Sequence, residues 1–195
     1  DASLRKRPMS RIFEPLQQFG AKIISRHNNL SPFAIIGNGS SMPIEYRMKM
    51  ASAQVKSAIL LASLATRGQT TIIEPEQCRD HTEIMMKSLG LKITQEKFSE
   101  NNHLGTKISY NGMQEFSGRD FDIPNDISSS AFFMVACLLI KDSKITLKKV
   151  GINPLRTGII TTLQEMGGQI IYKNIAEING EKVADIEVEY SKLEG

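Results

Sequence analysis

Three short segments of the chain share one pattern, and their spacing limits the folds that the chain can adopt. The segments FGAKI, LGLKI and MGGQI begin at residues 19, 89 and 166, so they lie 70 and 77 residues apart. In each segment a glycine follows a helical pattern and precedes residues typical of strands, as at a helix that ends on a left-handed glycine. A repeat of this length is too long for the common helical solenoids.

The repeated unit contains both helices and strands. Its order is β-α-β-α-β-β, and in the first complete copy the last two strands form a hairpin around the polar segment FSENNHLG, residues 98–105. Residues 8–36 have the pattern of the second half of an earlier copy. Strands are expected at 44–48, 70–75, 91–97, 106–112, 144–150, 168–173 and 182–190, and helices at 8–19, 52–66, 79–89, 128–140 and 156–166.

The first helix of each complete copy is apolar on nearly every side, over residues 58–65 and 131–140. A helix without a polar face is typical of a buried position, whereas the second helices are amphipathic and the strands alternate. The pattern therefore predicts an α/β fold in which helices lie inside and sheets lie outside.

Composition excludes several classes of protein. The 195 residues are 41% apolar and 23% charged, which is typical of a globular protein, and the net charge of +3 is scattered along the chain. We therefore expect no nucleic-acid partner. The longest apolar stretch, SAFFMVACLLI, is far shorter than the roughly 20 residues that span a bilayer, so we expect no membrane partner. Cys78 and Cys137 lack the spacing of a metal site, and two free thiols fit a cytoplasmic location.

The stretch MASAQVKSAILLASL, residues 50–64, opens an apolar helix with polar residues. The first N–H groups of a helix have no partner within the helix, and together with the helix dipole they attract anions. Ser52 is expected at the N-cap, Gln54 offers both a donor and an acceptor, and Lys56 adds a cation. Two interpretations stay open: an anion site, or plain capping with one solvated lysine.

Other predicted helices also begin with polar residues, several of them cationic. Arg79 and Asp80 open the helix at 79–89, and Asp80 and Glu83 have the spacing of a capping pair. Helix starts that recur in one repeated unit are expected on one side of a domain, although a lone arginine there is commonly just a surface cation. The remaining polar helix starts contain Arg5, Lys6, Arg7, Asp126, Ser128, Ser129, Ser130 and Arg156.

Five segments together resemble one enzyme family. They are DASLRKRPM, SAQVKSAILLASL, RDHTEIMMKSLG, IPNDISSSAFFMVACLL and VGINPLRTGIITTLQEMGG. In residues and in order they resemble 3-phosphoshikimate 1-carboxyvinyltransferase, or EPSP synthase. The patterns SAQVK and RDHTE resemble its glyphosate-tolerant class II branch. The resemblance runs from Asp1 to about Gly168.

The resemblance implies an inside-out α/β barrel of repeated βαβαββ units, arranged as a two-domain enzyme. Residues 1–122 would be part of the first domain, which binds shikimate 3-phosphate, and residues 123–195 would start the second. The implied reaction moves the enolpyruvyl group of phosphoenolpyruvate to the 5-hydroxyl of shikimate 3-phosphate and releases phosphate. The resemblance implies no cofactor, no metal and a monomer.

The resemblance also assigns binding residues. Ser52, Ala53, Gln54 and Arg79 match contacts to shikimate 3-phosphate, with Ala53 acting through its backbone. Arg7 and Gln54 match contacts to phosphoenolpyruvate, and a guanidinium suits a carboxylate or phosphate because it donates two parallel hydrogen bonds. Asp126 is expected to be structural, near the crossover between domains.

No catalytic residue is expected within the chain, which we interpret as a fragment. The family's early Lys-Ser…Arg cluster and Gly-rich loop would precede Asp1, and its catalytic base would follow Gly195. The isolated fragment should therefore be inactive. Two alternatives stay open: UDP-N-acetylglucosamine enolpyruvyl transferase, whose family uses a reactive cysteine in a mobile loop, and a non-catalytic anion-binding fragment. Neither Cys78 nor Cys137 lies in such a loop context.

Overall fold

A computed structural model describes residues 2–100 and 103–195 and divides the chain into two compact units. The first unit is Asp1–Ser117 and the second is Gly118–Gly195. The predicted boundary between residues 122 and 123 lies slightly further along the chain. The assignment of these stretches to two domains of a longer enzyme stays a prediction.

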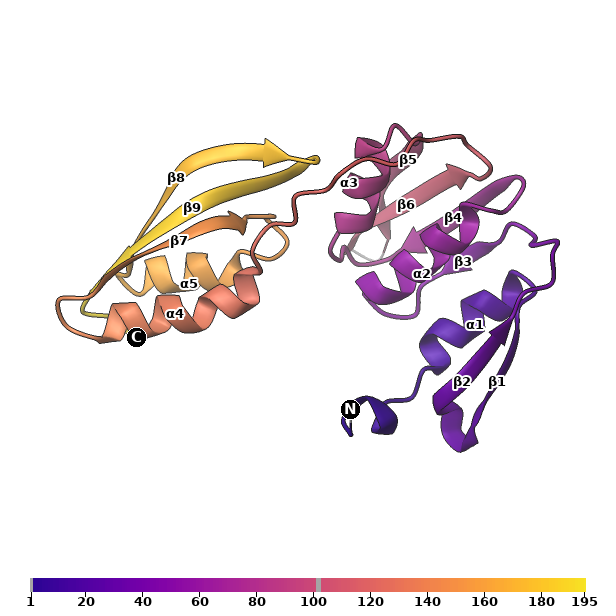
Figure 1. Ribbon diagram of the computed structural model, residues 1–195, viewed down its shortest axis with the longest axis horizontal. Coiled ribbons are helices and arrows are strands. Elements are labelled where there is room, and N and C mark those ends of the chain that lie inside the picture. Colours follow the sequence, from indigo (N-terminus) through magenta and orange to yellow (C-terminus); the bar gives the residue numbers. More distant parts are fainter. Residues whose placement is uncertain (1, 101–102) are drawn as a thin grey trace. The chain divides into compact units, whose positions relative to one another are not determined.

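The first unit contains a partial repeat followed by a complete one (Figure 1). The partial repeat packs a helix beside a two-stranded hairpin, and the complete repeat has the order β-α-β-α-β-β that the sequence predicts. The elements are η1 (Leu4–Lys6), α1 (Ser10–Gln18), β1 (Lys22–Arg26), η2 (His27–Asn29), β2 (Leu30–Ile36), β3 (Glu45–Arg47), α2 (Ala53–Ser63), β4 (Gln69–Glu74), α3 (His81–Ser88), β5 (Ile93–Glu100) and β6 (His103–Asn111).

The four strands of the complete repeat form one sheet in the order β3-β4-β6-β5. β3 is parallel to β4, and β6 is antiparallel to both β4 and β5. Tyr46, Ile72 and Ile108 occupy adjacent register positions across three strands and are all buried. They join Ile59 of α2 and Met86 of α3 in one apolar cluster, so both helices pack against the same face of the sheet.

The second unit repeats this plan with its first strand reduced to a single bridge. Asn125 forms an isolated parallel bridge with Val150, in the place where β3 pairs with β4 in the first unit. The sheet order β7-β9-β8 matches β4-β6-β5. The elements are α4 (Ile127–Leu139), β7 (Lys144–Gly151), α5 (Gly158–Glu165), β8 (Gln169–Ile178) and β9 (Glu181–Glu189).

Three glycines confirm the predicted repeat in its backbone geometry. Gly20, Gly90 and Gly167 follow α1, α3 and α5 and have φ angles of 98°, 86° and 91°. This left-handed conformation is nearly free of strain only for glycine, and it turns the chain out of the helix toward the next strand. The repeated segments are therefore helix ends that lead into hairpins.

The hairpin of the first unit corrects one prediction. Local polarity predicts a loop at 98–105, but the described residues of this segment extend the strands, since β5 runs to Glu100 and β6 begins at His103. Residues 101–102 lie outside the described residues. A Cβ at Gly105 would lie 2.4 Å from Cζ of Phe98, so glycine makes room for the phenyl ring across the strand pair. Cross-strand contacts therefore override the local signal.

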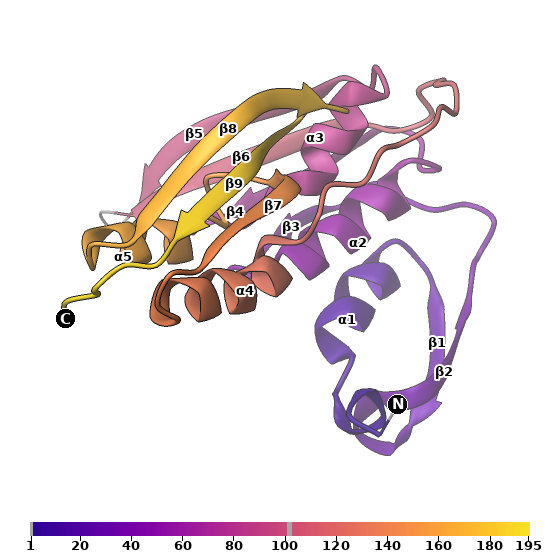
Figure 2. The same cartoon turned by 60° about the vertical axis from the view of Figure 1, so that its left-hand side comes forward.

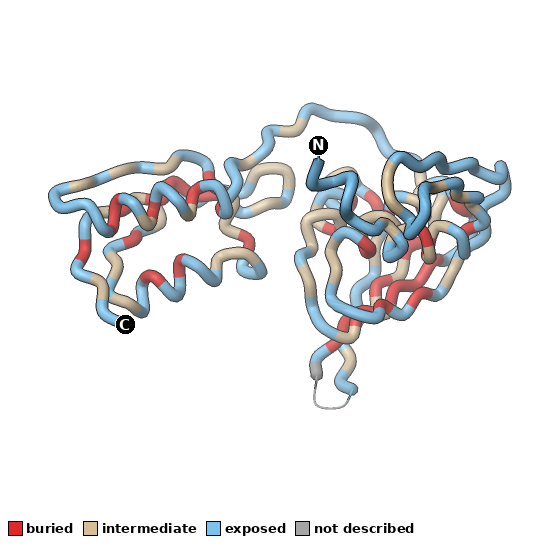
Figure 3. Tube along the Cα trace, turned by 90° about the horizontal axis from the view of Figure 1, so that it is seen from below, coloured by how far each residue is buried: buried red, intermediate tan, exposed pale blue. Residues whose placement is uncertain are grey.

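The helix α4 is less buried than its apolar sequence predicts. Together with α5 it covers one face of the sheet (Figures 1 and 2), and Met134 and Leu138 are fully buried there. Phe132 and Phe133 on the same helix are 79% and 63% exposed. Figure 3 shows this alternation of buried and exposed positions. Among the described residues, α4 is therefore buried only on the side that its own sheet contacts.

No helix in the described ranges, 2–100 and 103–195, is long and apolar enough to cross a membrane.

Candidate functional site

The N-terminus of α2 has the geometry that the sequence predicts. Ser52 is the N-cap, with an extended backbone, and its hydroxyl accepts a hydrogen bond from the N–H of Val55 at 3.4 Å. The N–H groups of Ala53 and Gln54 belong to the first turn and have no partner within the helix. The Gln54 side chain is exposed, and Ser52 is half-buried. This helix end therefore presents donors to solvent, as binding of an anion requires.

Lys56 does not supply the free cation that the sequence suggested. Its side chain is 1% exposed, and Nζ lies 3.1 Å from Oε1 of Glu74 and 2.8 Å from Oε1 of Glu83. Nζ also donates to the carbonyl oxygen of Cys78 at 3.4 Å. Lys56 is therefore part of a buried charged cluster beneath the helix ends, and the interpretation of it as a solvated lysine is also wrong.

Burial and the neighbouring charges shift the pKa values of Lys56 and Glu83. Burial alone would lower the pKa of Lys56, but Glu83 and then Glu74 outweigh it, so the pKa of Lys56 is raised. Burial raises the pKa of Glu83, and Lys56 opposes that effect only in part. Neither oxygen of Glu83 accepts a hydrogen bond of good geometry among the described residues, despite the short distance to Nζ. Glu83 therefore takes up a proton more readily than an ordinary glutamate does.

The start of α3 differs from the predicted capping pair. Asp80 is the N-cap residue, but its side chain makes no capping hydrogen bond to the helix. Glu83, which the spacing predicts at that cap, is buried against Lys56 instead. Arg79 precedes the cap and is exposed.

The helices α2 and α3 are joined directly near their N-termini. The hydroxyls of Ser57 on α2 and Thr82 on α3 lie 2.6 Å apart. Because Ser57 and Thr82 are close in the chain to Gln54 and Arg79, the two helix ends that carry the predicted ligands belong to one local structure. Sequence reasoning missed this link, since neither hydroxyl has a distinguishing local pattern.

Arg7 lies in a different part of the first unit. It follows η1, and η1 contacts β2 of the neighbouring hairpin. The Arg7 side chain is exposed. Its approach to Ser52 and Gln54 stays a prediction.

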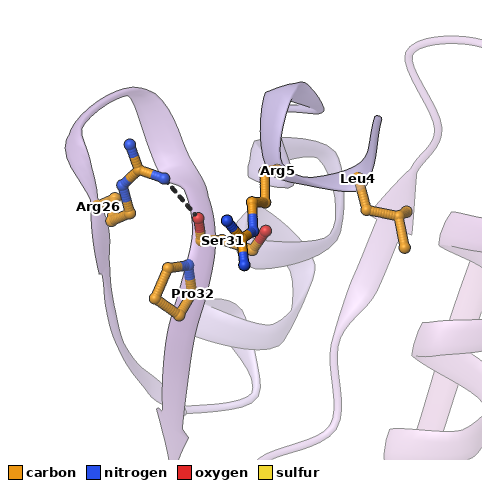
Figure 4. Close-up of a pocket in the computed structure, with 5 residues that line it drawn as sticks. All are labelled: Leu4, Arg5, Arg26, Ser31 and Pro32. Carbon is orange, nitrogen blue, oxygen red and sulfur yellow. Dashed lines mark hydrogen bonds between the residues drawn. The ribbon is translucent and has the colours of Figure 1, made fainter. Parts of the chain in front are cut away.

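A shallow cavity of about 420 Å³ lies beside η1 (Figure 4). It is lined by Leu4, Arg5, Arg26, Ser31 and Pro32. Nη1 of Arg26 donates to the carbonyl oxygen of Ser31 at 3.1 Å. This cavity contains none of the predicted ligand residues.

In the second unit, polar side chains connect the two helix starts. Asp126 caps α4 by accepting from the N–H of Ser129 at 3.0 Å. Arg156 donates through Nη2 to Oδ1 of Asp126 at 3.1 Å and to Oγ of Ser128 at 2.5 Å. The hydrogen bond from the Ser129 backbone, followed by the other local partners, lowers the pKa of Asp126. These contacts agree with a structural role for Asp126.

A family model for EPSP synthase (3-phosphoshikimate 1-carboxyvinyltransferase) matches residues 1–195. A protein of that enzyme name from Bartonella henselae is 50% identical over 196 residues, covering 100% of this chain and 43% of the relative. A protein of the same enzyme name from Carboxydothermus hydrogenoformans is 45% identical over 194 residues, covering 99% of this chain and 43% of the relative. The chain thus spans less than half the length of the curated relatives that it matches.

Solved structures agree with this similarity. An EPSP synthase from Acinetobacter baumannii has a TM-score of 0.82 and 43% identity, covering 100% of this chain and 42% of that one. The enolpyruvyl transferase NikO from Streptomyces tendae has a TM-score of 0.66 at 15% identity over 97% of this chain and 43% of its own, which shows a shared fold. The predicted enolpyruvyl transferase fold is confirmed, and the chain belongs to the EPSP synthase family.

Proposed function

We propose that the complete protein containing this chain transfers the enolpyruvyl group of phosphoenolpyruvate to the 5-hydroxyl of shikimate 3-phosphate. A bond forms between the hydroxyl oxygen and the enol carbon, and the bond from that carbon to the phosphate oxygen breaks. The hydroxyl loses its proton, and in the overall reaction the leaving phosphate takes up one proton. The family match over the whole chain supports this proposal.

The observation that carries the proposal is the joined pair of helix ends on α2 and α3. Ser52, Ala53 and Gln54 present hydroxyl, backbone and amide donors at one end, and Arg79 adds a guanidinium at the other. A phosphate group carries about two negative charges at neutral pH and accepts several hydrogen bonds. We assign these four residues to shikimate 3-phosphate, and Gln54 together with Arg7 to phosphoenolpyruvate.

The role of this chain in the site is binding rather than proton transfer. Donors held in place by folded helix ends lose little entropy when the ligand arrives, so they hold the two substrates in reacting geometry. The catalytic base and further cationic groups are expected outside residues 1–195, so the isolated chain should show no turnover. Residues 1–122 are proposed as part of the shikimate-phosphate domain and residues 123–195 as the start of the second domain. We also propose a monomeric protein located in the cytoplasm.

The experiment that tests the function is phosphate release from phosphoenolpyruvate by the complete protein with two acceptors in parallel. We expect release with shikimate 3-phosphate and none with UDP-N-acetylglucosamine. Release with the sugar nucleotide, or with neither acceptor, would contradict the proposal. Calorimetry with shikimate 3-phosphate then tells whether residues 1–195 bind this acceptor by themselves.

A further inference from the structure

We propose that the buried cluster of Lys56, Glu74 and Glu83 positions Arg79 relative to Gln54, and so sets the affinity of the anion site on α2 and α3. The identity of the anion, shikimate 3-phosphate, rests on the proposed function. The inference adds three positioning residues that lie beneath the exposed ligand groups.

The cluster holds the backbone directly before Arg79. Nζ of Lys56 donates to the carbonyl oxygen of Cys78, the peptide group that leads into Arg79, at 3.4 Å. Oε1 of Glu74 accepts from the N–H of Cys78 at 2.8 Å. Both polar backbone groups of Cys78 are thus bound by side chains of the cluster, and the starting direction of the Arg79 side chain is set by them.

The same cluster reaches the other helix end through Lys56. Lys56 follows Gln54 by two positions in the first part of α2, and its stem is packed inside the first unit. Glu83 brings the first turn of α3 to the same ammonium. Gln54 and Arg79 are therefore tied to one buried atom, Nζ of Lys56, through short stretches of backbone.

Burial makes this arrangement stiff. The side chains of Lys56, Glu74 and Glu83 are 1–2% exposed, so water does not substitute for a lost partner. Removing one partner of a buried ion pair leaves an uncompensated charge, and displaced geometries of the cluster are therefore costly. The link between the hydroxyls of Ser57 and Thr82 adds a second fixed point.

The second unit provides a comparison within the same chain. Its equivalent helix starts are joined by Arg156 and Asp126, whose side chains are 23% and 47% exposed. Exposed ion pairs are screened and hold geometry weakly. The buried version occurs in the unit that carries the four residues assigned to shikimate 3-phosphate.

A purely structural role for the cluster is the competing explanation, and a charge-free variant separates the two. The triple variant combines Lys56→Met, Glu74→Gln and Glu83→Met. The introduced glutamine keeps an acceptor for the N–H of Cys78, while the two methionines fill the volume. Replacing a buried ion pair by apolar side chains of similar size commonly leaves a protein equally stable. The variant therefore removes the bond to the Cys78 carbonyl while the fold is kept.

The test is a double-mutant cycle in the complete protein, with Arg79→Ala made in the wild type and in the triple variant. We expect the triple variant to keep its melting temperature and to lose about 10- to 100-fold in kcat/KM, mainly through KM for shikimate 3-phosphate, as for groups displaced by about 1 Å. In the triple variant, Arg79→Ala should lower kcat/KM only slightly further. The proposal would be overturned if Arg79→Ala lowered kcat/KM by the same factor in the wild type and in the triple variant. It would also be overturned if the triple variant had the kinetics of the wild type.

Lys49→Met is the matched control, because Lys49 is an exposed lysine paired with Glu14 in the same unit. It should change neither KM nor kcat. A change as large as that of the triple variant would show that loss of any lysine charge is enough, and would overturn the positioning role.

A second measurement needs neither a variant nor activity. In the wild-type complete protein, the amide of Cys78 should exchange with solvent deuterium as slowly as amides inside α2. Exchange at the rate of an open loop would mean that Glu74 and Lys56 do not hold this peptide. Absence of turnover with both substrates would count against the proposed function alone, while the exchange rate would still decide the role of the cluster.

Discussion

Nζ of Lys56 on α2 lies 2.8 Å from Oε1 of Glu83 on α3, and both side chains are 1% exposed. With Glu74 also at Nζ, the cluster contains two carboxylates and one ammonium. Removing the ammonium would leave both carboxylates buried without a cation. This pair connects the helix ends to which we assign the anion, and it determines how the unit responds to pH and to substitution.

Lys56→Met alone should destabilise the complete protein by about 3–5 kcal/mol, since it leaves Glu74 and Glu83 buried without a cation. The measurement is the free energy of unfolding in urea. Glu83→Met added to Lys56→Met should recover a large part of the loss. A single variant as stable as the wild type would show that the ion pair does not hold the first unit together.

Glu83→Gln should change the pH dependence of stability in a defined direction. The pKa of Glu83 is raised in the folded protein, so its contribution is fully present below the ordinary carboxyl pKa of about 4.3 and is lost as pH rises through the raised pKa. The variant has no titrating group at this position. The difference in free energy of unfolding, variant minus wild type, should therefore increase with pH. Thermal unfolding between acidic and neutral pH tests this, with exposed Glu96→Gln as the control, which should run parallel to wild type.

Gln54→Ala and Arg7→Ala should each lower kcat/KM by about 100-fold or more, because each removes donors assigned to the developing charge. Both side chains are exposed, so the melting temperature should hardly change. Steady-state kinetics with both substrates provide the measurement, and Gln17→Ala, at an exposed glutamine of α1, is the matched control. Near-normal kinetics for Arg7→Ala would refute its assignment to phosphoenolpyruvate.

Gly112→Ala should destabilise the first unit, since an added Cβ would lie 1.9 Å from the carbonyl oxygen of Thr66 and 2.3 Å from that of Ser63. Both obstacles are backbone atoms, so the chain after α2 would have to move. We expect a loss of about 1–3 kcal/mol or more in chemical unfolding. Gly37→Ala, where the new Cβ meets open space, should cost far less. Equal losses in the two variants would contradict the close approach.

Asp185 should protect the second unit against acid. Its carboxylate accepts from Nδ2 of Asn174, the N–H of Lys149 and Nζ of Lys148, each at 2.9 Å, and these bonds in that order lower its pKa to about 2. Its contribution is present above the ordinary aspartate pKa and is lost as pH falls through about 2.

Asp185→Asn should therefore reduce the melting temperature at neutral pH and flatten its fall between about pH 4 and pH 2. The exposed acid Glu177 on β8, changed to glutamine, is the control and should leave the shape of the curve unaltered. A wild-type curve that matches the Asp185→Asn curve would mean that the three hydrogen bonds do not favour the ionised carboxylate.

Cys78 should be an unreactive thiol. Burial first and Glu74 second raise its pKa to about 12, whereas the thiolate is the reactive form. In the complete protein, labelling at about pH 8, followed by mass spectrometry of the peptide that contains Cys78, should be on the order of 1,000-fold slower than for an ordinary exposed thiol. Fast labelling, or loss of turnover in Cys78→Ser, would favour an enzyme that depends on a reactive cysteine.

The sequence determined the repeated architecture because its signals are local. Gly20, Gly90 and Gly167 end helices through their own backbone freedom, and alternating strands follow each of them, so the order β-α-β-α-β-β could be predicted. The N-cap at Ser52 is equally local, since its hydroxyl reaches an N–H three residues further along the chain. The family resemblance came from the same short segments.

Only the tertiary structure decided the environment of the charged residues. Lys56 and Glu83 are 27 positions apart, and nothing near either one indicates that they meet inside the unit rather than in solvent or at a cap. The strand residues 98–100 and 103–105 and the exposed face of α4 likewise depend on contacts with distant residues. The sequence shows which side chains can carry a charge. Their pKa values and their partners depend on burial, which only packing between remote segments produces.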